Sequence, residues 1–239
     1  MKVNVYALPT LVPPNSHGPA VVIDVLRATS VMVTALAHGA DSITPVAEIE
    51  MARSLAGNYP AGSVLLGGER HALPIPGFDL GNSPREYTPD KVAGKQIILT
   101  TTNGTRALAL LAGVEPLYIG AFLNARAVAQ TLASLGQDAM LVCAGTRGRF
   151  TLDDVACAGL IAHHLSDLIP DLELDDLAYS ARFLYQHHRP NLKELISHAQ
   201  HFSYLKSIGL KADIDYCLQV DVLDLIPQVA NGIVTATKQ

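Results

Sequence analysis

The sequence is poor in charge and has no long apolar run. Charged residues make up only 16% of its 239 residues, and the formal net charge is −5 without a basic block. We therefore expect no nucleic acid and no membrane surface as a partner, because both bind clustered lysine and arginine. The most apolar stretch, residues 28–40, is shorter than the ~18 residues of a membrane span, and the first ten residues do not resemble a signal peptide.

Cysteine is scarce as well. The three cysteines, Cys143, Cys157 and Cys217, form no C-x-x-C pair, and such an odd, sparse set favours reduced thiols in the cytoplasm. Several catalytic signatures are missing, including the Gly-x-Ser-x-Gly elbow, the Walker loop and the G-x-G-x-x-G fingerprint. The Asp-x-Asp pair of haloacid-dehalogenase-type phosphatases is absent, because apolar residues follow Asp24.

Short β-branched runs alternate with helical patterns along most of the chain. The runs that predict strands are 21–24, 42–46, 63–67, 96–100, 116–120 and 139–143. The patterns that predict helices are 30–39, 48–57, 105–113, 124–136 and 153–165. This alternation predicts an α/β fold with three layers, α/β/α, in which helices cover both faces of a mainly parallel or mixed sheet.

The rest of the chain is less regular. Residues 171–208 are predicted to be mostly helical, residues 232–237 form a late strand, and residues 68–90 are too rich in proline and glycine for regular structure. Hydrophobic residues make up 49% of the chain, enough for a well-filled core. We expect a single domain over residues 1–239, with two closely packed α/β subdomains as the open alternative.

The first candidate site follows the strand at 21–24. Ligands of open parallel sheets bind beyond the carboxyl ends of the strands, where helix starts favour anions. Asp24 is a candidate metal ligand there, Arg27 can face an anion, and Thr29 and Ser30 can bind substrate or cap the helix. The alternative is an internal salt bridge between Asp24 and Arg27, with Thr29 as a plain cap.

The second candidate site is the loop over residues 100–105. Its hydroxyls, an amide and a glycine that permits close approach can hold phosphate oxygens. We expect substrate contacts from Thr102, Gly104 and Thr105 and a catalytic role for Asn103. The alternative is an ordinary Asn-Gly turn with a threonine cap.

The third candidate site follows the strand at 139–143. Thr146, Arg147 and Arg149 can bind a phosphate or sulfonate, because the guanidinium fork matches such groups. Asp153 and Asp154 offer hard oxygen ligands for Mg2+. Adjacent side chains point apart, so we expect only one of the two to reach a metal and the other to act as an N-cap or first-turn acid.

A further acid and arginine follow two glycines. Glu69 is expected to bind the metal and Arg70 the substrate, unless this segment is an exposed surface turn. Among the histidines only His71, directly after this segment, is a candidate. The pairs 163–164 and 187–188 lie in helical patterns, where neighbouring side chains point apart.

The set of motifs VVIDVLRATSVMVTALAHGA, GGER, PGFDLGNSP, TTNGT and CAGTRGRFTLDDVACAG, with the tail DIDYCLQVDVLDLIPQV, closely resembles the 2-phosphosulfolactate phosphatase family. The resemblance covers nearly the whole chain. It implies a Mg2+-dependent phosphatase that hydrolyses 2-phospho-3-sulfolactate to 3-sulfolactate and phosphate, a step of coenzyme M biosynthesis, with an α/β fold in a homodimer. The residues in matching motifs are Asp24, Arg27, Glu69, Asn103 and Arg147.

Chemistry assigns the individual roles within that set. Asp24, Arg27, Asn103 and Arg147 are expected to be catalytic, and arginines would neutralise the phosphoryl oxygens. Direct attack by water and transient phosphorylation of a carboxylate both stay open, with Asp24 as the first candidate nucleophile. The alternatives are a phosphatase for another small acidic phosphoester and a non-catalytic protein that binds phosphorylated metabolites.

Overall fold

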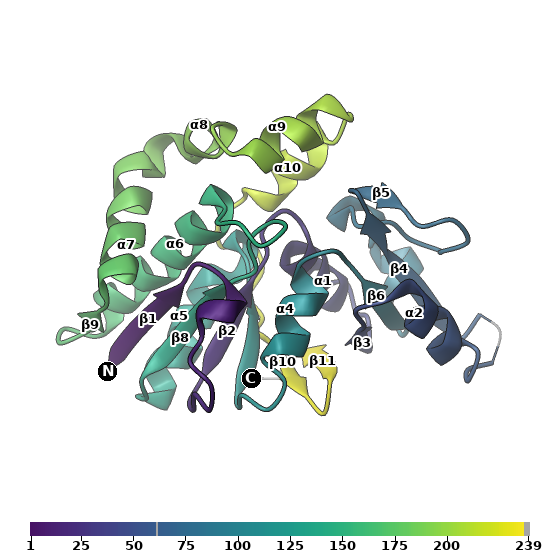
Figure 1. Cartoon of the computed structure of the whole chain (residues 1–239), viewed down its shortest axis with the longest axis horizontal. Coiled ribbons are helices and arrows are strands. Elements are labelled where there is room, and N and C mark those ends of the chain that lie inside the picture. The colour runs from purple at the N-terminus through teal and green to yellow at the C-terminus, as the bar shows by residue number, and fades with distance from the viewer. Residues whose placement is uncertain (61, 237–239) are drawn as a thin grey trace.

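The computed structural model describes residues 1–60 and 62–236. Within them, eleven strands form one sheet in the order β5-β4-β6-β3-β11-β10-β7-β2-β8-β1-β9. Strands β4, β6 and β3 pair in parallel, as do β7, β2, β8, β1 and β9. The antiparallel hairpin β10–β11 joins these two groups (Figure 1). The predicted α/β fold with a mixed sheet is confirmed.

The elements have the following bounds. The strands are β1 Lys2–Tyr6, β2 Ala20–Ile23, β3 Ser42–Pro45, β4 Val64–Arg70, β5 Leu73–Pro74, β6 Gln96–Thr100, β7 Leu117–Gly120, β8 Ala139–Cys143, β9 Glu173–Leu174, β10 Pro227–Ala230 and β11 Ile233–Ala236. The helices are α1 Ala28–Ala37, α2 Ile49–Ala56, α3 Pro89–Val92, α4 Gly104–Leu110, α5 Ala125–Leu135, α6 Leu152–Leu168, α7 Asp176–His188, α8 Leu192–Ser197, α9 Gln200–Ser207 and α10 Lys211–Cys217.

Helices cover both faces of the sheet. Every residue of the central strands β2 and β8 is buried, as expected for strands that have helices on both sides. Residues Val21 and Ile23 of β2 pack with α5, α6 and α7, whereas Ala20 and Val22 pack with α1 and α4. Because side chains alternate along the strand, β2 contributes to two separate hydrophobic cores, one on each face of the sheet, as a three-layer fold requires.

Four strands, β1, β5, β9 and β10, were not predicted. The hairpin of β10 and β11 had a recognisable signal in the sequence, the dipeptide Asn231-Gly232. Both residues have positive φ, as a tight Asn-Gly turn requires. The last strand confirms the prediction for 232–237 as far as Ala236, and Thr237 lies outside the described residues.

The prediction of no regular structure over 68–90 was wrong. Strand β4 continues to Arg70 and pairs with β5, and α3 follows at the end of this segment. Gly68 permits this, because a Cβ atom there would collide with the backbone of Thr100 on the neighbouring strand. The φ of +137° at Gly68 also suits glycine.

Helices α8, α9 and α10 lie above one end of the sheet, opposite the arm formed by β4 and β5 (Figure 1). These three helices, here named the helical cover (residues 192–217), follow the long helix α7. Across residues 1–60 and 62–236, none of the helices combines the length and apolar character that crossing a bilayer would demand.

Candidate active site

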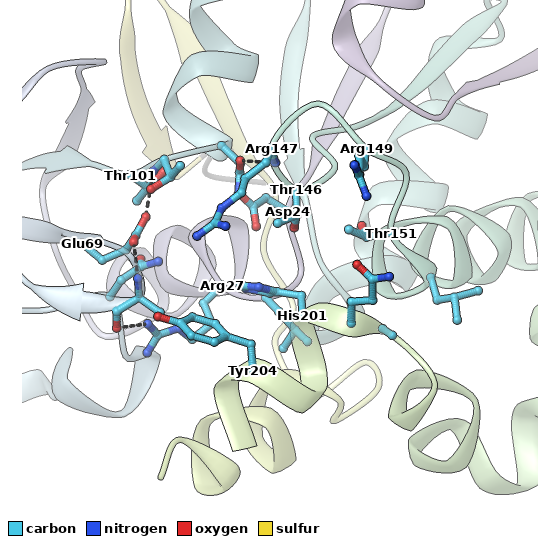
Figure 2. Close-up of a pocket in the computed structure, with 18 of the residues that line it drawn as sticks. Asp24, Arg27, Glu69, Thr101, Thr146, Arg147, Arg149, Thr151, His201 and Tyr204 are labelled. Carbon is cyan, nitrogen blue, oxygen red and sulfur yellow. Dashed lines mark hydrogen bonds between the residues drawn. The ribbon is translucent and has the colours of Figure 1, made fainter. Parts of the chain in front are cut away.

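A cleft of about 870 Å3 opens where β2, β4, β6 and β8 end, facing the helical cover. In Figure 2 the side chains of Asp24, Arg27, Arg147 and His201 point toward the same space. The cleft brings together eight of the predicted site residues, namely Asp24, Arg27, Glu69, Thr102, Asn103, Thr146, Arg147 and Arg149. The five motif residues that were expected to meet therefore share one cavity, although they come from four separate parts of the chain.

Asp24 sits directly after β2 and is only 5% exposed. Its backbone N–H donates to Thr29 Oγ1 at 3.0 Å, and the Thr29 N–H donates back to the Asp24 carbonyl oxygen at 3.0 Å. The Ser30 hydroxyl donates to the Val25 carbonyl oxygen at 2.8 Å. Thr29 and Ser30 are fully buried, lie outside the cleft lining and shape this turn, so their contacts with substrate stay a prediction.

The turn before α4 is built in a similar way. Thr101 and Thr105 exchange hydrogen bonds between backbone N–H and hydroxyl at 3.1 and 3.2 Å. A Cβ atom at Gly104 would lie 2.7 Å from Asp24 Oδ2, so glycine lets the start of α4 approach that carboxylate. Gly104 and Thr105 lie outside the cleft lining, so their contacts with substrate stay a prediction, whereas Thr101, which was not predicted, lines it.

The buried acids behind the cleft repel one another. Burial raises the pKa of Asp24 well above its usual range, and the neighbouring Asp154, Asp153 and Glu69 carboxylates raise it further. Burial also raises the pKa of Asp154 to about 6, although its two oxygens accept from the N–H groups of Val25 and Gly145, each at 2.9 Å. Asp154 therefore ties the end of β2 to the loop after β8.

The predicted metal ligands do not form a ready site. Among the described residues, no three His, Cys, Asp or Glu side chains are placed to hold one metal ion. Asp153 and Asp154 lie outside the cleft lining, because Asp154 binds backbone and Asp153 is buried beside it in the first turn of α6. Asp153 keeps one buried oxygen, Oδ1, without a hydrogen-bond partner. Only Asp24 and Glu69 of the predicted set face the cleft.

The neighbouring residues Glu69 and Arg70 differ in their position, because Glu69 lines the cleft and Arg70 does not. Glu69 is 6% exposed and accepts from the Thr102 N–H and the Ala72 N–H, both at 2.7 Å, so it joins the ends of β4 and β6. The Arg70 guanidinium donates to three oxygens outside the cleft, those of Glu69 O, Ala47 O and Thr100 Oγ1. These acceptors hold the Arg70 side chain outside the cleft lining, and its contact with substrate stays a prediction.

Arg27 is paired, but not with Asp24. Its Nη1 lies 2.6 Å from Asp213 Oδ2, and both side chains are almost completely buried. A second nitrogen, Nη2, donates to the Ala72 carbonyl oxygen at 3.0 Å, and the Ser83 hydroxyl donates to Asp213 Oδ1 at 2.7 Å. Arg27 therefore pairs with Asp213 and not, as the alternative interpretation had it, with Asp24. This salt bridge joins the floor of the cleft to the helical cover.

Arg147 and Arg149 carry charge that no neighbour balances. They stand on a tight turn in which the Thr146 N–H donates to the Arg149 carbonyl oxygen at 2.8 Å. The Arg147 N–H donates to Asn103 Oδ1 at 3.1 Å, which joins this turn to the loop after β6. Within the described part of the chain neither guanidinium forms a salt bridge, and both arginines are exposed. They are available to an anionic ligand.

The helical cover supplies lining residues that were not predicted. They are His198, Gln200, His201 and Tyr204. The pKa of His201 is lowered mainly by burial, and the Tyr204 hydroxyl donates to the His71 carbonyl oxygen at 2.8 Å across the cleft. Within α9, Gln200 and His201 precede Tyr204 by four and three residues, which places their side chains on one helix face. This spacing does not by itself indicate that the face meets the cleft. His71 lines the cleft as well, whereas the pairs 163–164 and 187–188 do not.

The fold and the cleft define an α/β protein that offers exposed arginines and a buried carboxylate to one anionic ligand. Comparison with protein families gives a match to 2-phosphosulpholactate phosphatase over residues 6–232. The chain belongs to this family, whose members are phosphoric monoester hydrolases.

Similar proteins extend over nearly the same length. A protein of Caldanaerobacter subterraneus subsp. tengcongensis is 46% identical, covering 91% of this chain and 90% of its own. Proteins of Clostridium acetobutylicum and Symbiobacterium thermophilum are 43% and 42% identical, each covering 89% of this chain and 90% or 91% of their own. All three are named probable 2-phosphosulfolactate phosphatase.

Proposed function

We propose that this phosphatase hydrolyses 2-phospho-3-sulfolactate to 3-sulfolactate and phosphate with the help of Mg2+, as a step of coenzyme M biosynthesis. The observation that carries the proposal is that Arg147 and Arg149 share one cleft with the buried carboxylate of Asp24. Neither arginine forms a salt bridge with any residue that the structure describes. The names of the similar proteins support this choice of substrate.

The charge distribution of the cleft suits such a substrate. A ligand with phosphate, sulfonate and carboxylate groups needs several donors, and the rim supplies them through Arg147, Arg149 and the hydroxyl of Thr146. Arginines at this position can neutralise phosphoryl oxygens as charge develops in the transition state. Asn103 is then a positioning residue, since its side chain accepts from the Arg147 N–H at 3.1 Å and holds the turn.

Two carboxylates of the cleft, Asp24 and Glu69, can hold a divalent cation. The negative charges of Asp153, Asp154 and Glu69 all raise the pKa of Asp24, so a cation at Asp24 would relieve this repulsion. Mg2+ is commonly held by one or two carboxylates together with substrate phosphate, so Asp24 and Glu69 suffice as protein ligands. When bound, the ion would supply Lewis-acid stabilisation of the phosphoryl oxygens. Asp24 is the candidate nucleophile if the reaction passes through a phosphorylated carboxylate.

Arg27 keeps a place in the proposed reaction. Two of its nitrogens donate to Asp213 and Ala72, and a guanidinium offers five N–H donors in all. Because the group lines the cleft while its charge is balanced by Asp213, we assign it hydrogen bonds to the ligand rather than net charge.

The test is phosphate release from a panel of small phosphoesters, measured with and without Mg2+. We expect turnover of 2-phospho-3-sulfolactate that is lost on chelation of the metal. Comparable turnover of many acidic phosphoesters would favour a broad phosphatase, and binding without phosphate release would favour a non-catalytic metabolite-binding protein.

We also propose that the protein works in the cytoplasm as a homodimer. The three cysteines support the location, since all are free and buried, and burial raises the pKa of each thiol. Sedimentation velocity would show a mass of twice 25.4 kDa if the dimer forms.

A further inference from the structure

A buried amide in the wall of the cleft has no hydrogen-bond partner among the residues that the structure describes. Asn82 is 6% exposed and lines the cleft. Its acceptor atom, Oδ1, is buried without a hydrogen-bond partner. Its donor atom, Nδ2, forms no hydrogen bond within the described residues and is not one of the fully buried unpaired atoms, so Nδ2 is the atom that a ligand in the cleft can reach. Buried amides in proteins are nearly always hydrogen-bonded, because leaving one unpaired costs free energy.

The turn around Asn82 is held firmly by its neighbours. The Gly81 N–H donates to Glu86 Oε2 at 2.6 Å, and the Tyr87 hydroxyl donates to the Gly81 carbonyl oxygen at 2.8 Å. On the other side, the Ser83 hydroxyl donates to Asp213 at 2.7 Å. The unpaired amide is therefore not explained by a loose loop, since both adjacent residues are fixed by hydrogen bonds.

The same contacts place this turn at the Arg27 end of the cleft. Asp213, which accepts from Ser83, also pairs with Arg27, and Arg27 donates to Ala72 of the cleft wall. The charge of Arg27 is already balanced there, so a ligand group at this end meets hydrogen-bond donors rather than free charge. An amide adds two N–H donors without adding charge.

We propose that Asn82 is a specificity-determining residue that donates hydrogen bonds to an acid group of the substrate other than the phosphoryl group. The inference rests on the proposed function and deepens it. The shared chemistry is that of an acid oxygen, which 2-phospho-3-sulfolactate carries on both its carboxylate and its sulfonate. The phosphoryl group is then bound by the exposed Arg147 and Arg149. A site built to donate hydrogen bonds rejects ligands that lack the acceptor, because its donors are left unpaired.

The test compares Asn82→Ala with the wild type on three phosphoesters. These are 2-phospho-3-sulfolactate, 2-phospholactate, which lacks the sulfonate, and the phosphoester of 2-hydroxyethanesulfonate, which lacks the carboxylate. We expect KM for the first to rise about 10- to 100-fold with little change in kcat, as for loss of a hydrogen bond to a charged group. The analogue whose KM does not respond to the substitution identifies the acid group that Asn82 binds.

Stability provides the second measurement. Because the Asn82 side chain forms no hydrogen bond with the described part of the chain, Asn82→Ala should keep the wild-type melting temperature, whereas a structural role would lower it by several degrees. The exposed Asn58 provides the matched control, since Asn58→Ala should change neither KM nor stability. An Asn82→Ala enzyme with wild-type KM on all three esters, or one with a lowered melting temperature, would overturn the inference.

Failure of the proposed function is separable from failure of this inference. If the wild type turns over none of the esters, the proposed function fails, and the rise in melting temperature caused by 2-phospho-3-sulfolactate still tests Asn82. A rise in the wild type that Asn82→Ala loses supports the inference, and an equal rise in both proteins, or none in either, contradicts it.

Discussion

The arginines of the cleft differ in how much of their charge a ligand can use. Arg27 is buried at the floor and paired with Asp213 at 2.6 Å, whereas Arg147 and Arg149 are exposed at the rim and form no salt bridge among the described residues. In the sequence all three follow a strand and look equivalent. The charged residues at the floor are therefore paired within the protein, whereas the arginines at the rim are available to a ligand.

The same contrast holds for the acids. Asp154 uses both oxygens to bind backbone N–H groups, while Asp24 turns its carboxylate to the cleft. Substitutions at the floor should therefore lower the stability of the fold, and substitutions of residues that face the ligand should lower activity. Three substitutions and one change of pH can test this division between floor and rim.

Asp24→Asn should remove nearly all turnover. We expect phosphate release to fall by at least about 10³-fold, as for loss of a central catalytic group. The melting temperature should stay equal or rise, because the substitution removes one of several buried carboxylates that repel each other. Steady-state kinetics and thermal unfolding of the same preparation check both points, and an active Asp24→Asn enzyme would exclude Asp24 from the mechanism.

Asp213→Ala should damage the fold itself. It leaves the Arg27 guanidinium buried without its counter-charge, and breaking such a pair typically costs about 3–5 kcal/mol of unfolding free energy. Urea denaturation measures the loss. Ser83→Ala removes only the neighbouring hydrogen bond to Asp213 and should cost about 1 kcal/mol. Equal stabilities of Asp213→Ala and the wild type would contradict the claim that the paired residues at the floor stabilise the fold.

Arg147→Ala should weaken substrate binding without destabilising the protein. Removal of a charge-assisted contact predicts a rise in KM of about 10- to 100-fold, while exposed residues without partners usually change stability by less than about 0.5 kcal/mol. Arg106→Ala is the matched control, since that arginine is exposed, lies outside the cleft lining and pairs only with Glu48 at the surface. A large loss of stability in Arg147→Ala would instead show that Arg147 has a structural role, like the paired residues at the floor.

The metal-free protein should become less stable as the pH rises. The pKa of Asp154 is raised to about 6 by burial, and those of Asp24 and Asp153 are raised in the same direction. A raised pKa means that protonation stabilises the fold below the unfolded value of about 3.9, and that this stabilisation is lost as the pH rises through the folded pKa. Melting temperatures should fall by several degrees between pH 5 and about 8, and Asp153→Asn should flatten the slope. A melting temperature that rises over this range would contradict the assignment.

Much of the site was predictable because its parts are local. The runs that became β2, β6 and β8 are strongly apolar, and the polar loops that follow them must meet where parallel strands end. This brought Asp24, Asn103 and Arg147 to one cleft. The roles of the hydroxyls were harder to predict, because a threonine in a loop can bind its own backbone as readily as a ligand, and Thr29 and Thr105 do so.

The remaining features depend on contacts that join distant parts of the chain. Asp213 lies 186 residues from Arg27, and no local pattern indicates that the two meet. The helical cover reaches the cleft only through the course of α7 and the turns after it, so the positions of His201 and Tyr204 were not predictable from spacing alone. The unpaired amide of Asn82 likewise becomes visible only when its surroundings are known.

The most direct test of the account is a crystal structure with Mg2+ and a non-hydrolysable phosphonate analogue of 2-phospho-3-sulfolactate. The account predicts the metal on the carboxylate of Asp24 and the phosphonate oxygens on the guanidinium groups of Arg147 and Arg149. An analogue bound outside this cleft, or bound in it without contact to any of these three side chains, would contradict the account.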